Sequence, residues 1–382
     1  MHDAPNMTRG LAGELRAIGF ATGLAAVECC PLSSWTATRT VLEQHQAAGF
    51  AATMQFTLRS PARSSDPRRA LKGANSIVVG AWAYGDSTVG HTGASTDGCD
   101  ERVWAQIARY AQRDIYAELD AALGEVAAAL IDRGHRARVV SDDNAVVDRE
   151  AAWRAGLGFA GKNSNVLLRG GRGSFVVIGS VITSALLERT APPAPDECGP
   201  CRRCIDACPT GAIVEPGVVD ARRCLAWVLQ APEPIPMELR PAVGQRIYGC
   251  DDCQEVCPPT RRNLRGPESG IVIDGPVSGV VDAVEWLKAT DAELLDRARR
   301  WYVPGRDAAI IRRNLLVILG NSVSGSVGAD AAGPVPAAVM EAVVSHLDHD
   351  NAMVAEHASW ALAALRAVEV AVGAPGRNND RS

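Results

Sequence analysis

Hydrophobic and polar positions follow two different rhythms in the first half of the chain. Residues 76–82 form a β-branched run (SIVVGAW) that is typical of a buried strand, and residues 174–184 follow a similar pattern. Residues 103–133 instead carry apolar side chains at helical spacing, which predicts one long helical segment. A short strand is expected at residues 138–140, directly before the polar stretch SDDN. Strands that alternate with a long helix indicate an α/β domain.

The last quarter of the chain is helical throughout by the same criterion. Residues 335–347 and 351–368 are two helical stretches joined by the polar link DHD. Their lengths predict a helical hairpin of the size found in HEAT-like repeats. Because one such pair cannot bury its own apolar face, we expect it to pack on the helix around residues 314–320.

Eight cysteines between these regions follow a known ligand spacing. The first run reads C-x2-C-x2-C-x3-C-P, the last reads C-x2-C-x3-C-P, and Cys224 stands between them. In bacterial ferredoxins with this spacing, the fourth cysteine of each run binds the other cluster. The sequence therefore predicts two 4Fe–4S clusters. The ligands are Cys198, Cys201, Cys204 and Cys257 for cluster 1, and Cys208, Cys224, Cys250 and Cys253 for cluster 2.

Structural zinc and a disulfide framework are the alternatives for these cysteines. Zinc sites favour four-ligand knuckles that often include histidine, and no histidine lies between Cys198 and Cys257. Disulfides need an oxidising compartment, and the sequence offers neither an export signal nor a segment of membrane-spanning length. We therefore expect a cytoplasmic protein without membrane association, in which Cys29, Cys30 and Cys99 are structural thiols.

Composition adds one local feature to this picture. The 382 residues are 47% hydrophobic, enough for two or three domains, and the net charge of −5 gives no overall nucleic-acid signature. Residues 297–313 are an exception, because they hold six arginines and one aspartate together with Trp301 and Tyr302. A basic run with aromatic residues suits phosphates and unstacked bases, and a solvated helix face is the alternative.

Two polar stretches of the first half are candidates for chemistry. Asp142 and Asp143 follow the strand predicted at residues 138–140, and ligand crevices of open α/β sheets lie beyond the carboxyl ends of strands. The alternative for Asp142 is an ordinary helix cap. In the second stretch, residues 156–164 (GLGFAGKNS), three glycines in six residues allow the backbone to approach a ligand closely. It is neither a Walker loop nor a dinucleotide fingerprint, because a strand-like segment follows it.

Several segments together resemble one enzyme family. They are, in chain order, SDDNAVVDREAAWRAGLGFAGKNSNVLL, CGPCRRCIDACPTGAI, DARRCLAWVLQ, RIYGCDDCQEVCPP, RRNLLVILGNS and VAEHASWALAAL. They are similar to epoxyqueuosine reductase, and the similarity runs from roughly residue 50 to residue 370. The resemblance implies an α/β cobalamin-binding catalytic domain (1–188), a ferredoxin-like domain with two 4Fe–4S clusters (189–266), an α-helical HEAT-like domain (280–372) and a disordered tail (373–382).

The resemblance also implies an activity and partners. The family reduces epoxyqueuosine in the wobble position of tRNA to queuosine. Electrons pass through the two clusters to cobalamin, which acts on the epoxide, and the oxygen leaves as water. The implied partners are tRNA as substrate and a low-potential electron donor such as flavodoxin or ferredoxin, and we expect a monomer.

Individual residues follow from matching the family's motifs. The catalytic aspartate corresponds to Asp142, by counting back from Arg149, and would act as the general acid that protonates the epoxide oxygen. Such a role needs a raised pKa, which an apolar pocket over the corrin could provide. The residues implied for cobalamin binding are Tyr110, Asp142, Gly161, Lys162, Asn163, Ser164 and Val166. The residues favoured for tRNA binding are Arg299, Arg300, Arg312 and Arg313.

The chain departs from the family's pattern at three places. Ala145 replaces a proline, the R-D-Y-H motif lacks its histidine after Arg113, and residues 228–231 read VLQA in place of I-E-H-H. Two other functions therefore stay open. One is a reductive dehalogenase-like cobalamin enzyme that acts on another electrophile, and the other is a ferredoxin-like electron-transfer module without a corrin.

Overall fold

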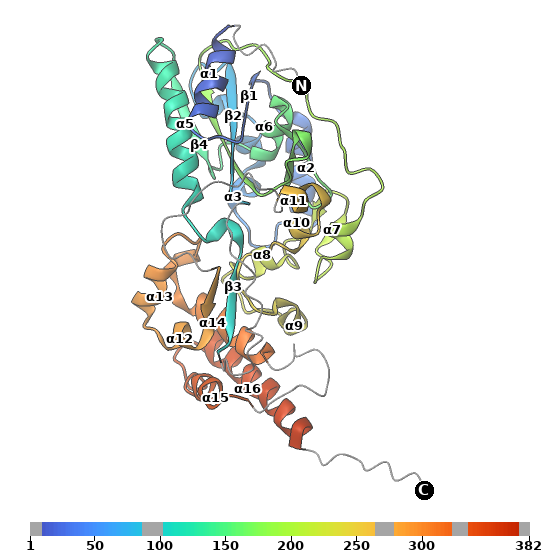
Figure 1. Ribbon diagram of the computed structural model, residues 1–382, viewed down its shortest axis with the longest axis vertical. Coiled ribbons are helices and arrows are strands. Elements are labelled where there is room, and N and C mark those ends of the chain that lie inside the picture. The colour runs from blue at the N-terminus through green and yellow to red at the C-terminus, as the bar shows by residue number, and fades with distance from the viewer. Residues whose placement is uncertain (1–9, 86–101, 264–278, 323–334, 374–382) are drawn as a thin grey trace. The chain divides into compact units, whose positions relative to one another are not determined.

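The computed structural model describes residues 10–85, 102–263, 279–322 and 335–373 (Figure 1). The chain forms two compact units that are interleaved in sequence. The first unit comprises residues 1–88, 113–224 and 251–275, and the second comprises residues 89–112, 225–250 and 276–382. The three-domain division stays a prediction. Cys99 and the tail beyond residue 373 lie outside the described residues.

A four-stranded sheet forms the centre of the first unit. Its strands, in spatial order, are β1 (Ala26–Pro31), β2 (Ser76–Ala83), β7 (Val176–Thr183) and β4 (Ala137–Ser141). The strands predicted from the sequence at these last three places are confirmed. Every neighbouring pair is antiparallel, so the argument from open parallel sheets was wrong. The SDDN stretch still begins where β4 ends, at Ser141.

Helices cover both faces of this sheet. They are α1 (Gly10–Ala21) and α5 (Ile115–Ile131) on one face, and α6 (Asp148–Ala155) on the other (Figure 1). Gly80 and Gly179 lie opposite each other in β2 and β7. A Cβ atom at either position would lie within 3.0 Å of the Leu123 side chain of α5. The two glycines therefore allow α5 to lie directly on the sheet.

The helix predicted over residues 103–133 is correct only in its second part. Asp114 caps α5, because its side chain accepts a hydrogen bond of 3.1 Å from the Ala117 N–H. Residues Trp104–Ile107 form strand β3 of the second unit, between β10 (Arg246–Tyr248) and β11 (Val280–Asp282). The apolar spacing of this short segment suits either structure, and pairing with strands distant in sequence decides between them.

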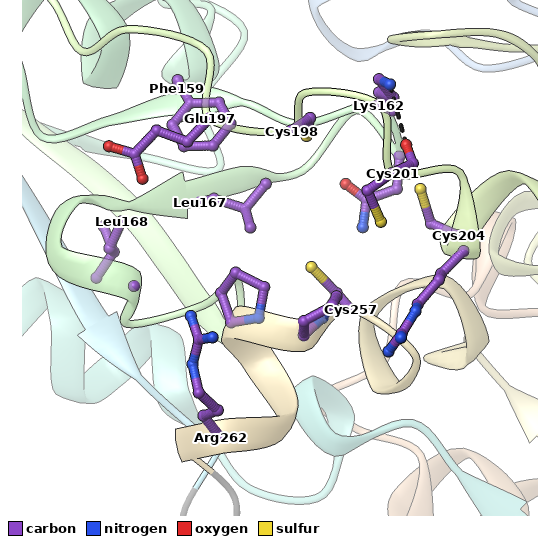
Figure 2. Close-up of a pocket in the computed structure, with 15 residues that line it drawn as sticks. Phe159, Lys162, Leu167, Leu168, Glu197, Cys198, Cys201, Cys204, Cys257 and Arg262 are labelled. Atoms are coloured by element: carbon purple, nitrogen blue, oxygen red, sulfur yellow. Dashed lines mark hydrogen bonds between the residues drawn. The ribbon is translucent and has the colours of Figure 1, made fainter.

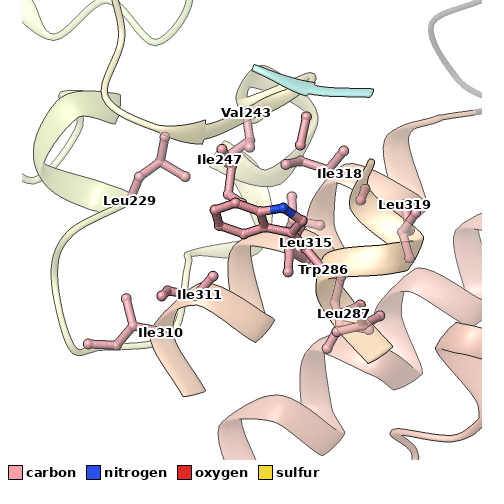
Figure 3. Close-up of a cluster of buried hydrophobic side chains, with 14 of the residues drawn as sticks. Leu229, Val243, Ile247, Trp286, Leu287, Ile310, Ile311, Leu315, Ile318 and Leu319 are labelled. Atoms are coloured by element: carbon pink, nitrogen blue, oxygen red, sulfur yellow. The ribbon is translucent and has the colours of Figure 1, made fainter. Parts of the chain in front are cut away.

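The second unit is mainly helical, with α14 (Ala308–Asn321) in contact with most of its other helices. These are α9 (Arg240–Val243), α12 (Ala283–Lys288), α13 (Asp291–Arg297), α15 (Ala337–Val344) and α16 (Ala352–Gly373). Figure 3 shows Trp286 of α12 beside Leu315 of α14 in the hydrophobic core of this unit. The predicted helical hairpin and its packing on the helix around residues 314–320 are confirmed by α14, α15 and α16.

The remaining elements are short. They are α2 (Thr36–Ala47), α3 (Phe56–Arg59), α4 (Pro61–Ser64), β5 (Gly158–Ala160), β6 (Val166–Leu168), α7 (Arg203–Asp206), β8 (Ile213–Glu215), β9 (Val218–Val219), α8 (Leu225–Val228), α10 (Asp252–Glu255), α11 (Pro258–Asn263) and the 3-10 turns η1 (Pro67–Arg69), η2 (Arg109–Ala111), η3 (Arg169–Gly171), η4 (Met237–Leu239) and η5 (Pro304–Arg306). Among the described helices, none is long and apolar enough to cross a membrane.

Candidate iron–sulfur and catalytic site

Four cysteines from two distant segments line one cavity of the first unit. Cys198 and Cys201 lie on the loop before α7, Cys204 lies within α7, and Cys257 directly precedes α11. Figure 2 shows these four side chains around the same space, and the cavity has a volume of about 280 Å³. They are the four residues predicted as ligands of cluster 1.

The donor set and the lining fit a 4Fe–4S cluster. One cubane needs four thiolate ligands, and these four cysteines line the same cavity. Phe159 and Leu167 pack against Cys198 and Cys257 and supply an apolar wall. Such a wall limits the access of water to the site.

Buried hydrogen bonds hold the segment that carries Cys257. The Cys257 N–H donates to the Gln254 carbonyl over 3.1 Å. Gln254 is buried, and its Oε1 accepts a hydrogen bond of 2.9 Å from the Ser174 hydroxyl. The Ser174 N–H in turn donates to the Thr260 hydroxyl over 3.2 Å. The start of β7 therefore positions a cysteine that lies about eighty residues further along the chain.

Three of the four cysteines predicted for cluster 2 also lie in the first unit, and Cys250 belongs to the second. The Ala212 N–H donates to Cys208 Sγ over 3.2 Å. The buried Thr210 hydroxyl donates to the Arg223 carbonyl over 2.6 Å, which links the segments that carry Cys208 and Cys224. An N–H···S bond is typical of a cluster ligand, because it stabilises negative charge on sulfur. The complete ligand set of cluster 2 stays a prediction.

The loop of residues 161–165 contacts both cysteine segments. Lys162 Nζ donates to the Gly199 carbonyl over 2.6 Å and to the Cys201 carbonyl over 2.9 Å, and Figure 2 shows the second of these bonds. Asn163 Nδ2 donates to the Cys253 carbonyl over 3.2 Å, and Asn165 Nδ2 lies 3.9 Å from Cys253 Sγ. The sequence reading missed Asn165, and its position directly after Lys-Asn-Ser is the only local signal.

Asp142 lies on a strained turn directly after β4. Its φ is +47°, in the left-handed region that non-glycine residues rarely occupy. Solvent reaches the side chain, yet surrounding protein atoms raise the pKa of the carboxyl and the charge of Asp143 raises it further. This environment favours the neutral acid.

The capping alternative for Asp142 does not hold. Val147 occupies the cap position of α6. The neighbour Asp143 stabilises the turn instead, because its side chain accepts a hydrogen bond of 2.8 Å from the Ala145 N–H. Asp143 also forms an ion pair of 2.8 Å with Arg138. Asp142 makes no hydrogen bond or ion pair with a described residue, so its carboxyl is available to a ligand.

Asp148 and Arg149, the first residues of α6, were not predicted as site residues. Burial raises the pKa of Asp148 well above its usual range, and the charge of Asp142 raises it further. Arg149 opposes this effect, and its guanidinium donates to the Ser164 carbonyl over 2.8 Å. The charge of Asp142 therefore acts on Asp148, and Arg149 connects the start of α6 to the loop of residues 161–165. The D-x5-D-R spacing alone would not have identified this arrangement.

The arginines predicted for tRNA binding fall into two groups. Arg299 and Arg300 are exposed. Arg312 and Arg313 are buried in α14, so the expectation of an exposed position was wrong for these two. Arg313 donates to the carbonyls of Ala231, Val228, Leu229 and Glu233, and Arg312 to those of Leu287 and Ala289. They stabilise the core of the second unit.

Tyr110 lies in the second unit and contacts Gln230, a residue at which this chain departs from the family's pattern. Its hydroxyl accepts a hydrogen bond of 3.0 Å from Gln230 Nε2. Gln230 stands where the resembling family has a histidine. Three other residues predicted for cobalamin binding, Gly161, Asn163 and Val166, are buried.

Comparison with known proteins shows that this chain is similar to other proteins over nearly its whole length. Residues 197–260 match the family described as "4Fe-4S double cluster binding domain". Over 371 residues the chain is 31% identical to an epoxyqueuosine reductase of Alicycliphilus denitrificans, covering 92% of this chain and 96% of that protein. It is also 31% identical to the enzyme of Shewanella oneidensis, over 96% of this chain and 91% of that protein. The chain belongs to the epoxyqueuosine reductase family. It therefore carries the iron–sulfur domain and the oxidoreductase character of that family.

Solved structures of epoxyqueuosine reductases share the fold. The structure from Streptococcus thermophilus has a TM-score of 0.80 and 24% sequence identity, and covers 94% of this chain and 90% of that one. An epoxyqueuosine reductase in complex with an epoxyqueuosine-modified stem-loop of tyrosine tRNA has a TM-score of 0.71 and 23% identity, over 92% of this chain and 98% of that one. These similarities show that this chain has the same fold as the two solved structures.

Proposed function

We propose that this protein reduces epoxyqueuosine in the wobble position of tRNA to queuosine. The observation that carries the proposal is the similarity to epoxyqueuosine reductases over nearly the whole length of both chains. Two features of the first unit support it. One is the set of four cysteines around a cavity, and the other is a solvent-accessible carboxyl, Asp142, with a raised pKa.

The reaction consumes two electrons and two protons. Both C–O bonds of the epoxide break, a carbon–carbon double bond forms, and the oxygen leaves as water. The electrons come from a low-potential donor such as flavodoxin or ferredoxin and enter through the two clusters one at a time. We infer that the ligands are the eight cysteines assigned from the sequence, with Cys257 crossing over to cluster 1.

We infer that cobalamin is the group that receives these electrons. When bound, it supplies a low-potential metal centre that can deliver electrons to the epoxide. Asp142 and Ser164 would form the accessible side of this cofactor site, and both have a positive φ, of +47° and +66°. Arg149 holds Ser164 in place through its hydrogen bond to the carbonyl. The buried residues Gly161 and Val166 would shape the wall behind them, and Lys162, Asn163 and Tyr110 stay predictions for contact with the cofactor.

Asp142 would supply one of the two protons. A carboxylic acid protonates the leaving oxygen only while it is neutral, and the environment of Asp142 extends the neutral form to higher pH. The missing internal hydrogen bonds leave the carboxyl free to meet the epoxide oxygen. Burial raises the pKa of Asp148 well above its usual range, and we assign it no contact with the substrate.

We further propose that the protein acts as a monomer and that Arg299 and Arg300 contact the tRNA backbone. Both side chains are exposed on the second unit, beside the exposed Tyr302. Cations beside an exposed ring suit a phosphate next to an unstacked base.

Anaerobic turnover tests the proposal. The protein, with both clusters and cobalamin reconstituted, is incubated with epoxyqueuosine-containing tRNA and a strong reductant, and the nucleosides are analysed by mass spectrometry. We expect queuosine to appear. A cobalamin spectrum without queuosine would favour a dehalogenase-like enzyme acting on another electrophile. The absence of any cobalamin spectrum would favour an electron-transfer module.

A further inference from the structure

A short basic segment borders the loop that carries Asp142. Residues 59–72 hold five cations and one carboxylate, whereas the chain as a whole carries a net charge of −5. The cations are Arg59, Arg63, Arg68, Arg69 and Lys72, and all five are exposed. This segment includes the last residue of α3 and the whole of α4 and η1, and it belongs entirely to the first unit.

Three of these cations have no hydrogen-bond or ion-pair partner among the described residues. Arg68 is paired with Asp66 at 2.7 Å, and Arg59 donates to the Gln55 side chain over 3.2 Å. The side chains of Arg63, Arg69 and Lys72 form no ion pair or hydrogen bond with any residue that the structure describes. A charged group without an internal partner on an otherwise acidic protein is available to an anionic ligand.

Two contacts fix this segment against the Asp142 loop. The buried Ser64 hydroxyl donates to the Asn144 carbonyl over 2.7 Å. Arg138 donates to the Ala70 carbonyl over 3.0 Å and at the same time pairs with Asp143 at 2.8 Å. The first contact lies one residue from Arg63 and the second one residue from Arg69. Both free arginines therefore lie at the border of the loop.

The position of residues 59–72 beside the Asp142 loop suits them to contact the phosphates of an RNA substrate. A nucleotide whose base moiety reaches Asp142 brings its own phosphates close to the rim of the site, because the backbone is covalently continuous. Phosphate contacts by Arg and Lys provide most of the salt-dependent affinity for nucleic acids and fix the register of the strand. In the second unit, Arg312 and Arg313 are buried and cannot supply such contacts.

We propose that residues 59–72 form a phosphate-binding surface that receives the tRNA backbone next to the reacting nucleotide. Arg63, Arg69 and Lys72 make the contacts, and Ser64 and Arg138 hold the surface against the Asp142 loop. The inference rests on the proposed function, because it takes tRNA as the substrate.

The test measures binding separately from turnover. The variant Arg63→Gln/Arg69→Gln/Lys72→Gln and the wild-type protein, both with their clusters, are titrated against a fluorescent tRNA anticodon stem-loop at several salt concentrations. With about 0.7 counterions released per contact on single strands, losing three contacts lowers the salt slope by about 2. Between about 50 and 200 mM salt, the wild-type protein should then lose about twentyfold more affinity than the variant.

A control variant distinguishes the loss of this surface from a general loss of positive charge. Arg133→Gln/Lys288→Gln/Arg366→Gln removes the same three charges at exposed positions outside residues 59–72. We expect this control to keep the wild-type slope. Equal iron content and circular dichroism spectra show that both variants are folded. If the first variant also keeps the wild-type affinity and slope, the surface is refuted, whereas wild-type turnover would leave the proposed function standing.

Two further outcomes distinguish the two proposals. A wild-type protein that does not bind the stem-loop at any salt concentration would overturn both. A wild-type protein that binds with the predicted difference in slope, but produces no queuosine in the anaerobic assay, would overturn the proposed function and support the surface.

Discussion

Two aspartates six positions apart have different roles because their surroundings differ. Asp142 is accessible on a strained turn, and Asp148 is half-buried at the start of α6. Burial raises the pKa of both carboxyls, and each carries a further contribution from a neighbouring aspartate. Only Asp142 combines a raised pKa with access, which is the combination that a general acid needs.

Replacing Asp142 by asparagine should abolish turnover while both clusters and cobalamin stay bound. An amide cannot donate the proton, so we expect a loss of at least about 100-fold, the lower end for general acid catalysis. In the wild-type protein the single-turnover rate should fall as pH rises through the raised pKa of Asp142, because the acid form is lost. Anaerobic single-turnover rates across pH measure both effects. An unchanged rate in the variant would reject the acid role.

Replacing Asp148 by asparagine should stabilise the protein at neutral pH. A carboxyl whose pKa is raised by folding favours the folded state at low pH, and this contribution is lost as pH rises through the folded pKa. The asparagine variant lacks this dependence. Chemical denaturation of both proteins at acidic and neutral pH should show the largest advantage of the variant at neutral pH. An equal difference at both pH values would contradict the raised pKa.

At the scale of elements, the loop of residues 161–165 connects the site to the cluster segments. Its side chains contact the backbone of Gly199, Cys201 and Cys253, and Arg149 holds its middle through Ser164. The family resemblance predicts that this loop lines the corrin pocket, and that stays a prediction. Its hydrogen bonds place Lys162 beside ligands of cluster 1.

Replacing Lys162 by methionine should lower the reduction potential of cluster 1. An ammonium beside the cluster stabilises the extra negative charge of the reduced state, and methionine keeps the length of the side chain without the charge. A redox titration followed by EPR measures the potential. Lys162→Arg is the control and should stay close to wild type. Equal potentials in all three proteins would show that Lys162 is only structural.

Replacing Arg313 by methionine should destabilise the second unit by roughly 3 kcal/mol, because buried carbonyls lose their donor. Arg313 is fully buried in α14, and burial lowers its pKa to about 9. Its guanidinium donates to the carbonyls of Ala231 and Val228 over 2.8 and 3.2 Å. Thermal unfolding measures the loss, with the exposed Arg299→Gln as control. A change in the salt dependence of RNA binding, without loss of stability, would contradict the structural role.

At the scale of the whole molecule, the cysteine segments bring distant parts of the chain together. Cys198 and Cys257 are far apart in sequence, yet they pack against the same residues, Phe159 and Leu167. A cluster bound by both would crosslink these segments, and metal binding of this kind stabilises the folded state.

Two single substitutions test how the cysteines are shared between the clusters. Cys257→Ala should perturb cluster 1 and leave cluster 2, and Cys224→Ala should do the reverse. Iron analysis should fall from about eight to about four atoms per chain when the perturbed cluster is lost, and EPR should show a different remaining signal in each variant. Identical remaining signals would refute the crossed ligand assignment.

The sequence by itself determined the features that depend on local spacing. The C-x2-C-x2-C-x3-C run indicated its ligands, β-branched runs located β2 and β7, and helical spacing located α15 and α16. Each of these signals lies within one segment, where covalent spacing already fixes which side chains share a face or a loop.

Only the tertiary structure decided the features that depend on partners distant in sequence. Strand pairing made residues 104–107 a strand and the sheet antiparallel. Packing buried Arg312 and Arg313, although the same arginines read as a basic surface in the sequence. The environment of Asp148 and the free cations beside the Asp142 loop follow from neighbours that sequence spacing does not specify. Burial and charge compensation are sums over such neighbours, and for this reason they appear only once the chain is folded.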